Sequence, residues 1–116
     1  MENEVYYFDL IDEYFDRAFT EEEEEFLSNV LVQKIKNGET LSGSECTIAD
    51  ELFYFDSGSY LDFDNGYVDV EIILKIDDKF YKLIQTTNDF TSYFKEDQVA
   101  ELVERKEVKV VKWTPI

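Results

Sequence analysis

The chain of 116 residues contains no histidine, one cysteine, one proline and four glycines. The missing histidine removes the commonest general base and metal ligand, together with every catalytic triad built on it. The single cysteine, Cys46, excludes an internal disulfide bond and suits a reducing compartment. No histidine is present to activate this thiol, and the neighbouring Glu45 is expected to raise its pKa. The four glycines do not have the spacing of a phosphate-binding loop.

Basic side chains are also scarce, since 11 lysines and arginines stand against 28 aspartates and glutamates and the formal net charge is -17. Binding to DNA, RNA or an anionic membrane is disfavoured, because such binding needs lysine and arginine to displace counterions. A positively charged partner is favoured instead. Residues 1–66 hold 18 acidic and 3 basic side chains, whereas residues 67–116 hold 10 and 8. The N-terminal part therefore produces most of the negative field.

Long hydrophobic runs are absent as well. No apolar stretch is long enough to cross a bilayer, and the first four residues, Met-Glu-Asn-Glu, include two acids where a signal peptide would be basic. Hydrophobic residues still make up 44% of the chain and aromatic residues 16%, which is too apolar for a disordered acidic tail. A chain of this length can bury one core without cross-links. We therefore expect a single folded domain, residues 1–116, in the cytoplasm.

Two helices are predicted in the N-terminal part. Apolar residues at helical spacing indicate a helix over Val5–Phe19, although the Val-Tyr-Tyr-Phe opening also fits a strand. Thr20-Glu21-Glu22-Glu23 has the form of a capping box, so a second helix should begin there and end at Asn37-Gly38. If the first helix forms, its acidic residues lie three and four positions apart and make a ridge on one face. These residues are Asp9, Asp12, Glu13 and Asp16.

A β-hairpin is predicted where two runs of alternating apolar and polar residues meet at Asn65-Gly66. Asn-Gly is the strongest short-range signal for a two-residue hairpin turn, because both turn positions need positive φ. The resulting register places Asp62 opposite Asp69 and Tyr60 opposite Glu71. Like charges facing each other cost roughly 0.2–1 kcal/mol per pair, which suggests a functional role. One face is apolar, with Leu61, Phe63, Val68 and Val70. The other face has no cation and carries Tyr60, Asp62, Asp64, Tyr67, Asp69 and Glu71.

The remaining segments complete an α+β fold, with two N-terminal helices packed on an antiparallel sheet of about four to five strands. Residues 45–55 fit either a short helix or a buried strand. A tight turn at Asp77-Asp78 should return the chain as a strand over Lys79–Thr86. Residues 87–97 are expected to be a loop, and residues 98–105 a helix turn or a strand. Alternating lysine and valine predict a last strand over Glu107–Trp113.

Paired carboxylates are the only chemistry left for a catalytic or metal site. Asp62-x-Asp64-x-Gly66 resembles part of a calcium loop, but its glycine comes one position early and Ile73 stands where a bidentate glutamate is needed. A divalent ion bridging Asp62 and Asp69 stays open. A hydrolase working with two carboxylates is formally allowed, but a convex hairpin face is a poor cleft. We therefore predict no cofactor, no metal site and no enzymatic activity.

Binding of a partner through the acidic surface would explain more features of the sequence than a catalytic or metal site would. Carboxylates repeat about every 6.6 Å along each hairpin strand, which is twice the rise per residue. DNA presents a dense array of negative charge, one per roughly 1.7 Å of axis, and regularly spaced acids on a rigid surface can occupy a groove that binds phosphates. Tyrosines among them would supply the rigid anchors found at interface hot spots. The predicted partner-binding residues are Tyr60, Asp62, Asp64, Tyr67, Asp69, Glu71, Asp9, Asp12, Glu13 and Asp16.

In size, acidity and the acidic hairpin and helix, the chain resembles the small acidic inhibitors of phages and mobile elements, namely DNA-mimic anti-restriction and anti-CRISPR proteins. The resemblance implies a non-enzymatic protein that blocks DNA binding by a nuclease effector. An immunity protein or antitoxin that neutralises a basic toxin would use the same chemistry. An acidic domain with an unrelated binding role is the third alternative. The expected partner is a basic nucleic-acid-binding protein, with no direct binding of nucleic acid or membrane.

Overall fold

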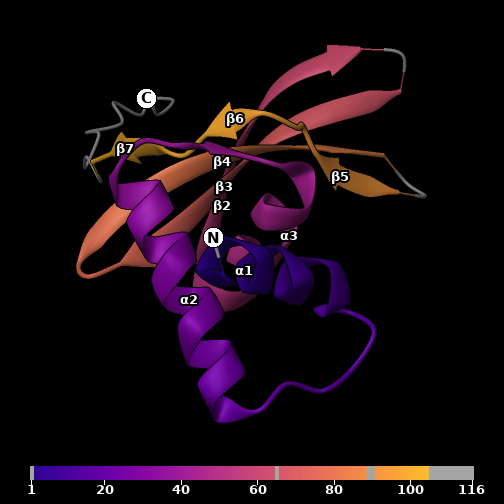
Figure 1. The fold of residues 1–116 in the computed structure, drawn as a ribbon. Coiled ribbons are helices and arrows are strands. Elements are labelled where there is room, and N and C mark those ends of the chain that lie inside the picture. The colour runs from indigo at the N-terminus through magenta and orange to yellow at the C-terminus, as the bar shows by residue number, and fades with distance from the viewer. Residues whose placement is uncertain (1, 65, 89–90, 105–116) are drawn as a thin grey trace, which may run out of the picture.

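The computed structural model describes residues 2–64, 66–88 and 91–104, and the side chains of residues 6–57, 66–88 and 91–104. The predicted α+β class is confirmed, since helices pack on an antiparallel sheet of five strands (Figure 1). The helices are α1 (Glu2–Glu13), α2 (Glu21–Lys36) and α3 (Gly43–Phe53). The third helix resolves the ambiguity of residues 45–55. Among the described residues, no helix is both long and apolar enough to span a bilayer.

The five-stranded sheet has the order β2-β3-β4-β5, and β7 also pairs with β4. A separate pair joins β1 to β6. Every pairing of these strands is antiparallel. For β2-β3, β3-β4 and β4-β5 this follows from the short connection between the two strands. The strands are β1 (Thr40–Leu41), β2 (Tyr54–Asp64), β3 (Tyr67–Ile76), β4 (Lys79–Thr87), β5 (Ser92–Phe94), β6 (Gln98–Val99) and β7 (Glu101–Val103).

The helix ends follow local capping chemistry. The predicted capping box at Thr20 is confirmed, because its hydroxyl accepts from the Glu23 N–H while the Glu23 carboxylate accepts from the Thr20 N–H. The predicted end at Asn37-Gly38 is also confirmed, with Gly38 at φ 69. The predicted bounds of the first helix were wrong, since α1 ends at Glu13 rather than Phe19. The chain needs the following residues to turn toward the start of α2.

The hairpin prediction holds near the turn and fails beyond it. Asp62 pairs with Asp69 and Asp64 with Tyr67 as predicted, and Gly66 has the expected positive φ of 82. Tyr60, however, pairs with Val70 rather than Glu71, because β2 carries a register shift between Tyr60 and Asp62. Such a bulge adds a residue to one strand, which simple alternation does not reveal. Asn65 lies outside the described residues.

The second half of the chain was predicted less fully. The Asp77-Asp78 turn is confirmed, with φ of 50 and 65, and β4 follows it as the predicted returning strand. Residues 87–97 were predicted as a loop but include β5. The ambiguous segment after them forms β6 and β7. The strand predicted over 107–113 lies outside the described residues.

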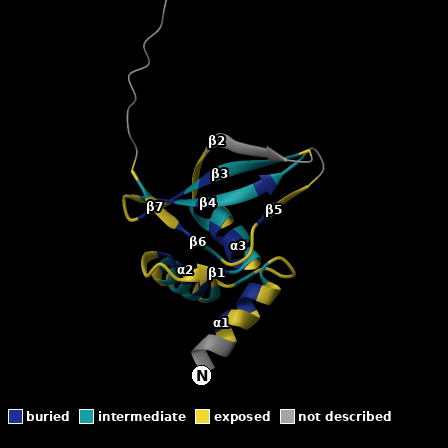
Figure 2. Cartoon of the chain, turned by 90° about the horizontal axis from the view of Figure 1, so that it is seen from above, coloured by how far each residue is buried: buried dark blue, intermediate teal, exposed yellow. Residues whose placement is uncertain are grey.

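Two hydrophobic clusters hold the layers together. One lies between α3 and the sheet and contains Leu74 and Leu83, both fully buried. The other lies among the three helices and contains Leu10 of α1, Leu27 of α2 and Ile48 of α3. The half-buried Phe53 at the end of α3 packs against both clusters. The exposed residues of α1 therefore stand on a helix that its neighbours hold in place (Figure 2).

Candidate protein-docking surface

The acidic residues predicted to bind a partner fall on two separate parts of the molecule. The β2–β3 hairpin and α1 lie at opposite ends in Figure 2, and they are also apart in Figure 1. The side chains of Tyr60, Asp62 and Asp64 lie outside the described residues. The side chains of Tyr67, Asp69 and Glu71 are only partly exposed. The two acidic patches must therefore be considered one at a time.

None of the six residues predicted on the polar hairpin face is basic, but neighbouring segments of the chain bring cations to two of them. Asp69 accepts a hydrogen bond from the Thr86 hydroxyl at 2.8 Å and from Lys95 Nζ at 3.0 Å. These contacts, with the Thr86 bond first, lower the pKa of the Asp69 carboxyl. Glu71 lies 4.0 Å from Lys82 Nζ. Both lysines come from segments that neighbour β3 only after the sheet has formed.

The acidic ridge of α1 is exposed as predicted. The side chains of Asp9, Asp12, Glu13 and Asp16 all lie on the surface, with Asp16 just beyond the end of the helix. Within the described part of the chain, only Glu13 of these four has a cation within ion-pair distance. Three carboxylates of this ridge therefore keep their charge available to a partner.

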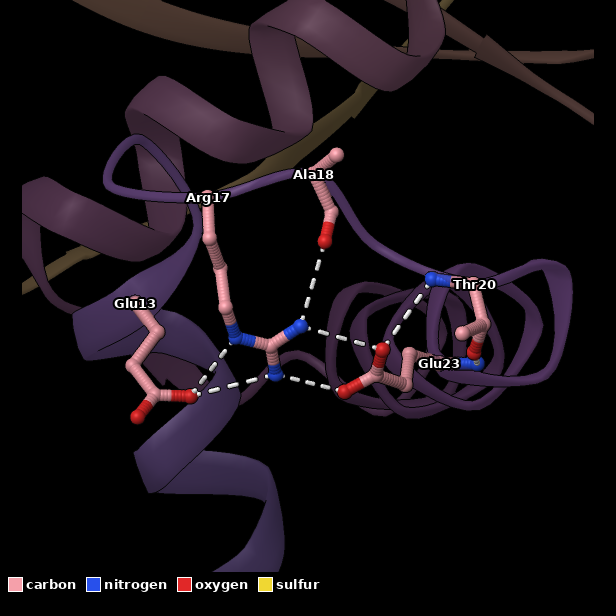
Figure 3. A network of polar contacts seen from close by, with 5 residues as sticks. All are labelled: Glu13, Arg17, Ala18, Thr20 and Glu23. Atoms are coloured by element: carbon pink, nitrogen blue, oxygen red, sulfur yellow. Dashed lines mark hydrogen bonds and ion pairs between the residues drawn. The ribbon is translucent and has the colours of Figure 1, made fainter.

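Arg17 fixes the junction between α1 and α2 (Figure 3). Its guanidinium lies 3.1 Å from Glu13 and 2.5 Å from Glu23, and it donates to the Ala18 carbonyl at 3.2 Å. The same group sits 4.5 Å from the ring centre of Phe19. The hydrogen bond from Arg17 is the largest cause that lowers the pKa of Glu23 to about 2. Because the guanidinium of Arg17 pairs with Glu13 and Glu23, it does not neutralise the other carboxylates of the α1 ridge.

A groove of about 670 Å³ runs beside the α1 ridge, and we call it the α1–β5 groove. Its lining comes from the end of α1, the start of α3 and the segment from β5 to the loop that follows. Sequence reasoning missed most of these residues, because only the fold brings the three segments together. The apolar lining residues are Ile11, Phe15, Tyr93 and Phe94. The charged ones are Asp12, Asp16, Lys95 and Glu96.

A buried polar cluster ties the three helices to one another. Glu45 of α3 is only 3% exposed, and it accepts from Tyr7 Oη at 2.5 Å and from Lys34 Nζ at 2.7 Å. It also closes a capping box with Ser42 at the start of α3. Burial alone would raise the pKa of the Glu45 carboxyl, but the bonds from Lys34, Tyr7 and Ser42 outweigh burial and lower it. The Ser-x-x-Glu pattern was the local signal that could have revealed this helix start.

The side chains considered for metal or thiol chemistry are the carboxylates and Cys46. The described residues contain no group of three or more side chains suited to holding a metal ion. A metal bridge between Asp62 and Asp69 stays untested, because the side chain of Asp62 lies outside the described residues. Cys46 is fully buried, and burial, with Glu45 next, raises the pKa of its thiol to about 12. A thiol in this state is a core residue rather than a nucleophile.

Comparison of the chain with family models, with curated proteins and with solved structures gave no match.

Proposed function

We propose that the chain is a non-enzymatic inhibitor that acts in the cytoplasm. Its acidic surface binds the nucleic-acid-binding face of a basic effector protein and so blocks the binding of DNA. The observation that carries this proposal is the acidic ridge of α1, where Asp9, Asp12 and Asp16 are exposed and have no described cation within ion-pair distance. A surface that binds phosphates would be complementary to this ridge in charge.

The first turn of α2 extends the same field. Glu21, Glu22 and Glu24 are exposed in this turn, and Glu25 is exposed directly after it. Arg17 places the turn beside the end of α1, because it pairs with both Glu23 and Glu13. Tyr14, the residue after the end of α1, lies within this field: burial raises the pKa of its hydroxyl, and the charges of Glu51 and then Glu24 raise it further. These glutamates complement the helix dipole, which accounts for part of their number. Together with the α1 ridge they form one acidic end of the molecule.

This arrangement shifts the expected contact from the hairpin to α1. Asp69 and Glu71 already face lysines of the same chain, and a partner would have to displace those lysines to use them. The α1 ridge requires no such exchange. Long-range attraction should also make association fast and sensitive to salt, because exposed charges are screened beyond about 8 Å at physiological ionic strength.

The proposal is tested by capturing a partner on the immobilised chain, purifying that partner, and measuring the affinity of the pair at increasing concentrations of duplex DNA. We expect DNA to compete, and the affinity to fall steeply as salt rises. Binding that is unchanged in excess DNA would contradict the proposal. A captured partner that binds no nucleic acid would also contradict it and would favour the toxin-neutralising alternative.

Charge variants locate the contact. We expect Asp9→Asn/Asp12→Asn/Asp16→Asn to weaken partner binding strongly while circular dichroism shows an unchanged fold. The matched control, Asp56→Asn/Asp78→Asn/Glu104→Gln, removes the same number of exposed charges outside the acidic end and should bind nearly as well as the original chain. Equal losses in both variants would mean that net charge, rather than the α1 surface, determines binding.

A further inference from the structure

The α1–β5 groove combines an apolar floor with exposed aromatic rings. Ile11 and Phe94 are buried and form the floor, whereas Phe15 is 61% exposed and Tyr93 51% exposed. Both rings therefore leave a large apolar area open to solvent beside one groove. Their exposed area offers aromatic surface to a flat group that enters the groove.

Among the described residues, four charged side chains line the groove, namely Lys95, Glu96, Asp12 and Asp16. Lys95 lines the groove, but its ammonium is held by Asp69 of the sheet. Glu96 lies over Gly43, where an added Cβ would meet the Glu96 side chain at 3.2 Å, so its negative charge sits near the start of α3. A helix N-terminus stabilises such a charge. Asp12 and Asp16 are the carboxylates on the α1 side of the groove, and neither they nor Glu96 has a described cation within ion-pair distance.

We propose that the α1–β5 groove is the docking site for an arginine side chain of the basic partner. This inference rests on the proposed function and deepens it by naming the residue type that the partner contributes. A guanidinium is planar and weakly hydrated, stacks on aromatic faces, and donates two parallel hydrogen bonds to a carboxylate. A lysine ammonium is compact and strongly hydrated, so it uses aromatic walls less well.

The test uses the isolated full chain, labelled for NMR, and a short capped peptide that contains arginine. Two matched peptides replace arginine by lysine or by citrulline, which has nearly the same shape but no charge. We expect the arginine peptide to shift the signals of Asp12, Phe15 and Tyr93, and to bind about tenfold more tightly than the citrulline peptide. Equal binding of the lysine peptide would overturn the preference for a guanidinium. The absence of shifts at the groove would overturn the site.

Matched variants separate a site from general attraction. Asp12→Asn/Asp16→Asn and Phe15→Ala should each weaken binding of the arginine peptide, and the exposure of these residues makes a folding defect unexpected. The control, Asp9→Asn/Glu25→Gln, removes the same charge from the same acidic end but not from the groove lining. An equal loss in the control would show diffuse attraction and overturn the proposal.

The two proposals fail in distinguishable ways. If a captured partner competes with DNA but the arginine peptide does not bind the groove, the proposed function stands and the arginine site is wrong. If the peptide binds the groove but DNA does not displace the partner, the inhibitor function is wrong while the groove remains a cation site.

Discussion

Removing Glu45 should destabilise the domain more than removing any exposed acid. The Glu45→Ala substitution deletes the acceptor shared by Tyr7 and Lys34 and opens the capping box at the start of α3. Because Glu45 links α1, α2 and α3 at one buried point, its loss acts on the whole helical layer. The Lys34 ammonium, whose side chain is 18% exposed, would be left without its carboxylate.

The loss of stability in Glu45→Ala is set by the Lys34 ammonium, which stays partly buried without its carboxylate. Removing one partner of a buried ion pair typically costs about 3–5 kcal/mol, because the other charge stays behind uncompensated. Lys34 can turn partly toward solvent, so we expect a loss near the lower end, about 3 kcal/mol. Domains of this kind are stable by only about 5–15 kcal/mol. For a chain of this length the loss corresponds to a fall in melting temperature of about 10–15 °C.

The assay is thermal and urea unfolding, with Glu23→Ala as the matched control. Glu23 occupies the same capping-box position in α2 and also pairs with a basic residue, but its ion pair is exposed. The control therefore removes a cap and a surface pair without leaving a buried charge, and its effect should be clearly smaller. If both variants lose the same stability, the buried pair does not hold the helices together and the reasoning is refuted.

The contribution of Glu45 should also depend on pH. The folded pKa of its carboxyl is lowered, so the charged form stabilises the fold at pH values above the unfolded pKa, which is about 4.3. The stabilisation is lost as the pH falls through that value toward the lower folded pKa. The difference in stability between the original chain and Glu45→Gln should therefore be largest near neutral pH and shrink on acidification. A constant difference across this range would contradict the linkage.

Two further predictions concern other carboxylates. Burial, with Glu51 second, raises the pKa of Asp50, and its Oδ1 is buried without a hydrogen-bond donor among the described residues, so Asp50→Asn should raise the melting temperature at pH 7. The gain should disappear as the pH falls below both pKa values, and a loss of stability at pH 7 would show that the charged form is favourable. Asp69→Asn should keep the Thr86 hydrogen bond but release Lys95 beside the α1–β5 groove. We expect little change in melting temperature and weaker binding of the arginine peptide, whereas unchanged peptide affinity would show that Lys95 stays away from the groove.

The sequence by itself determined the features that depend on residues close together in the chain. The capping box at Thr20, the turn at Asp77-Asp78 and the acidic ridge of α1 were all readable, because capping, turn conformation and helical spacing act over a few positions. The α+β class followed from the order of these elements. The bulge in β2 was not readable, since register depends on the strand that pairs with it.

Only the tertiary structure decided which charges are free and which are already paired. Lys95 reaches Asp69 across 26 positions of sequence, and Tyr7 reaches Glu45 across 38. Both contacts exist because packing places distant segments side by side, and no local pattern encodes them. The same packing brings Phe15 and Tyr93 to one groove. Composition therefore determined the sign of the surface charge, whereas the fold decided where on the surface that charge is available.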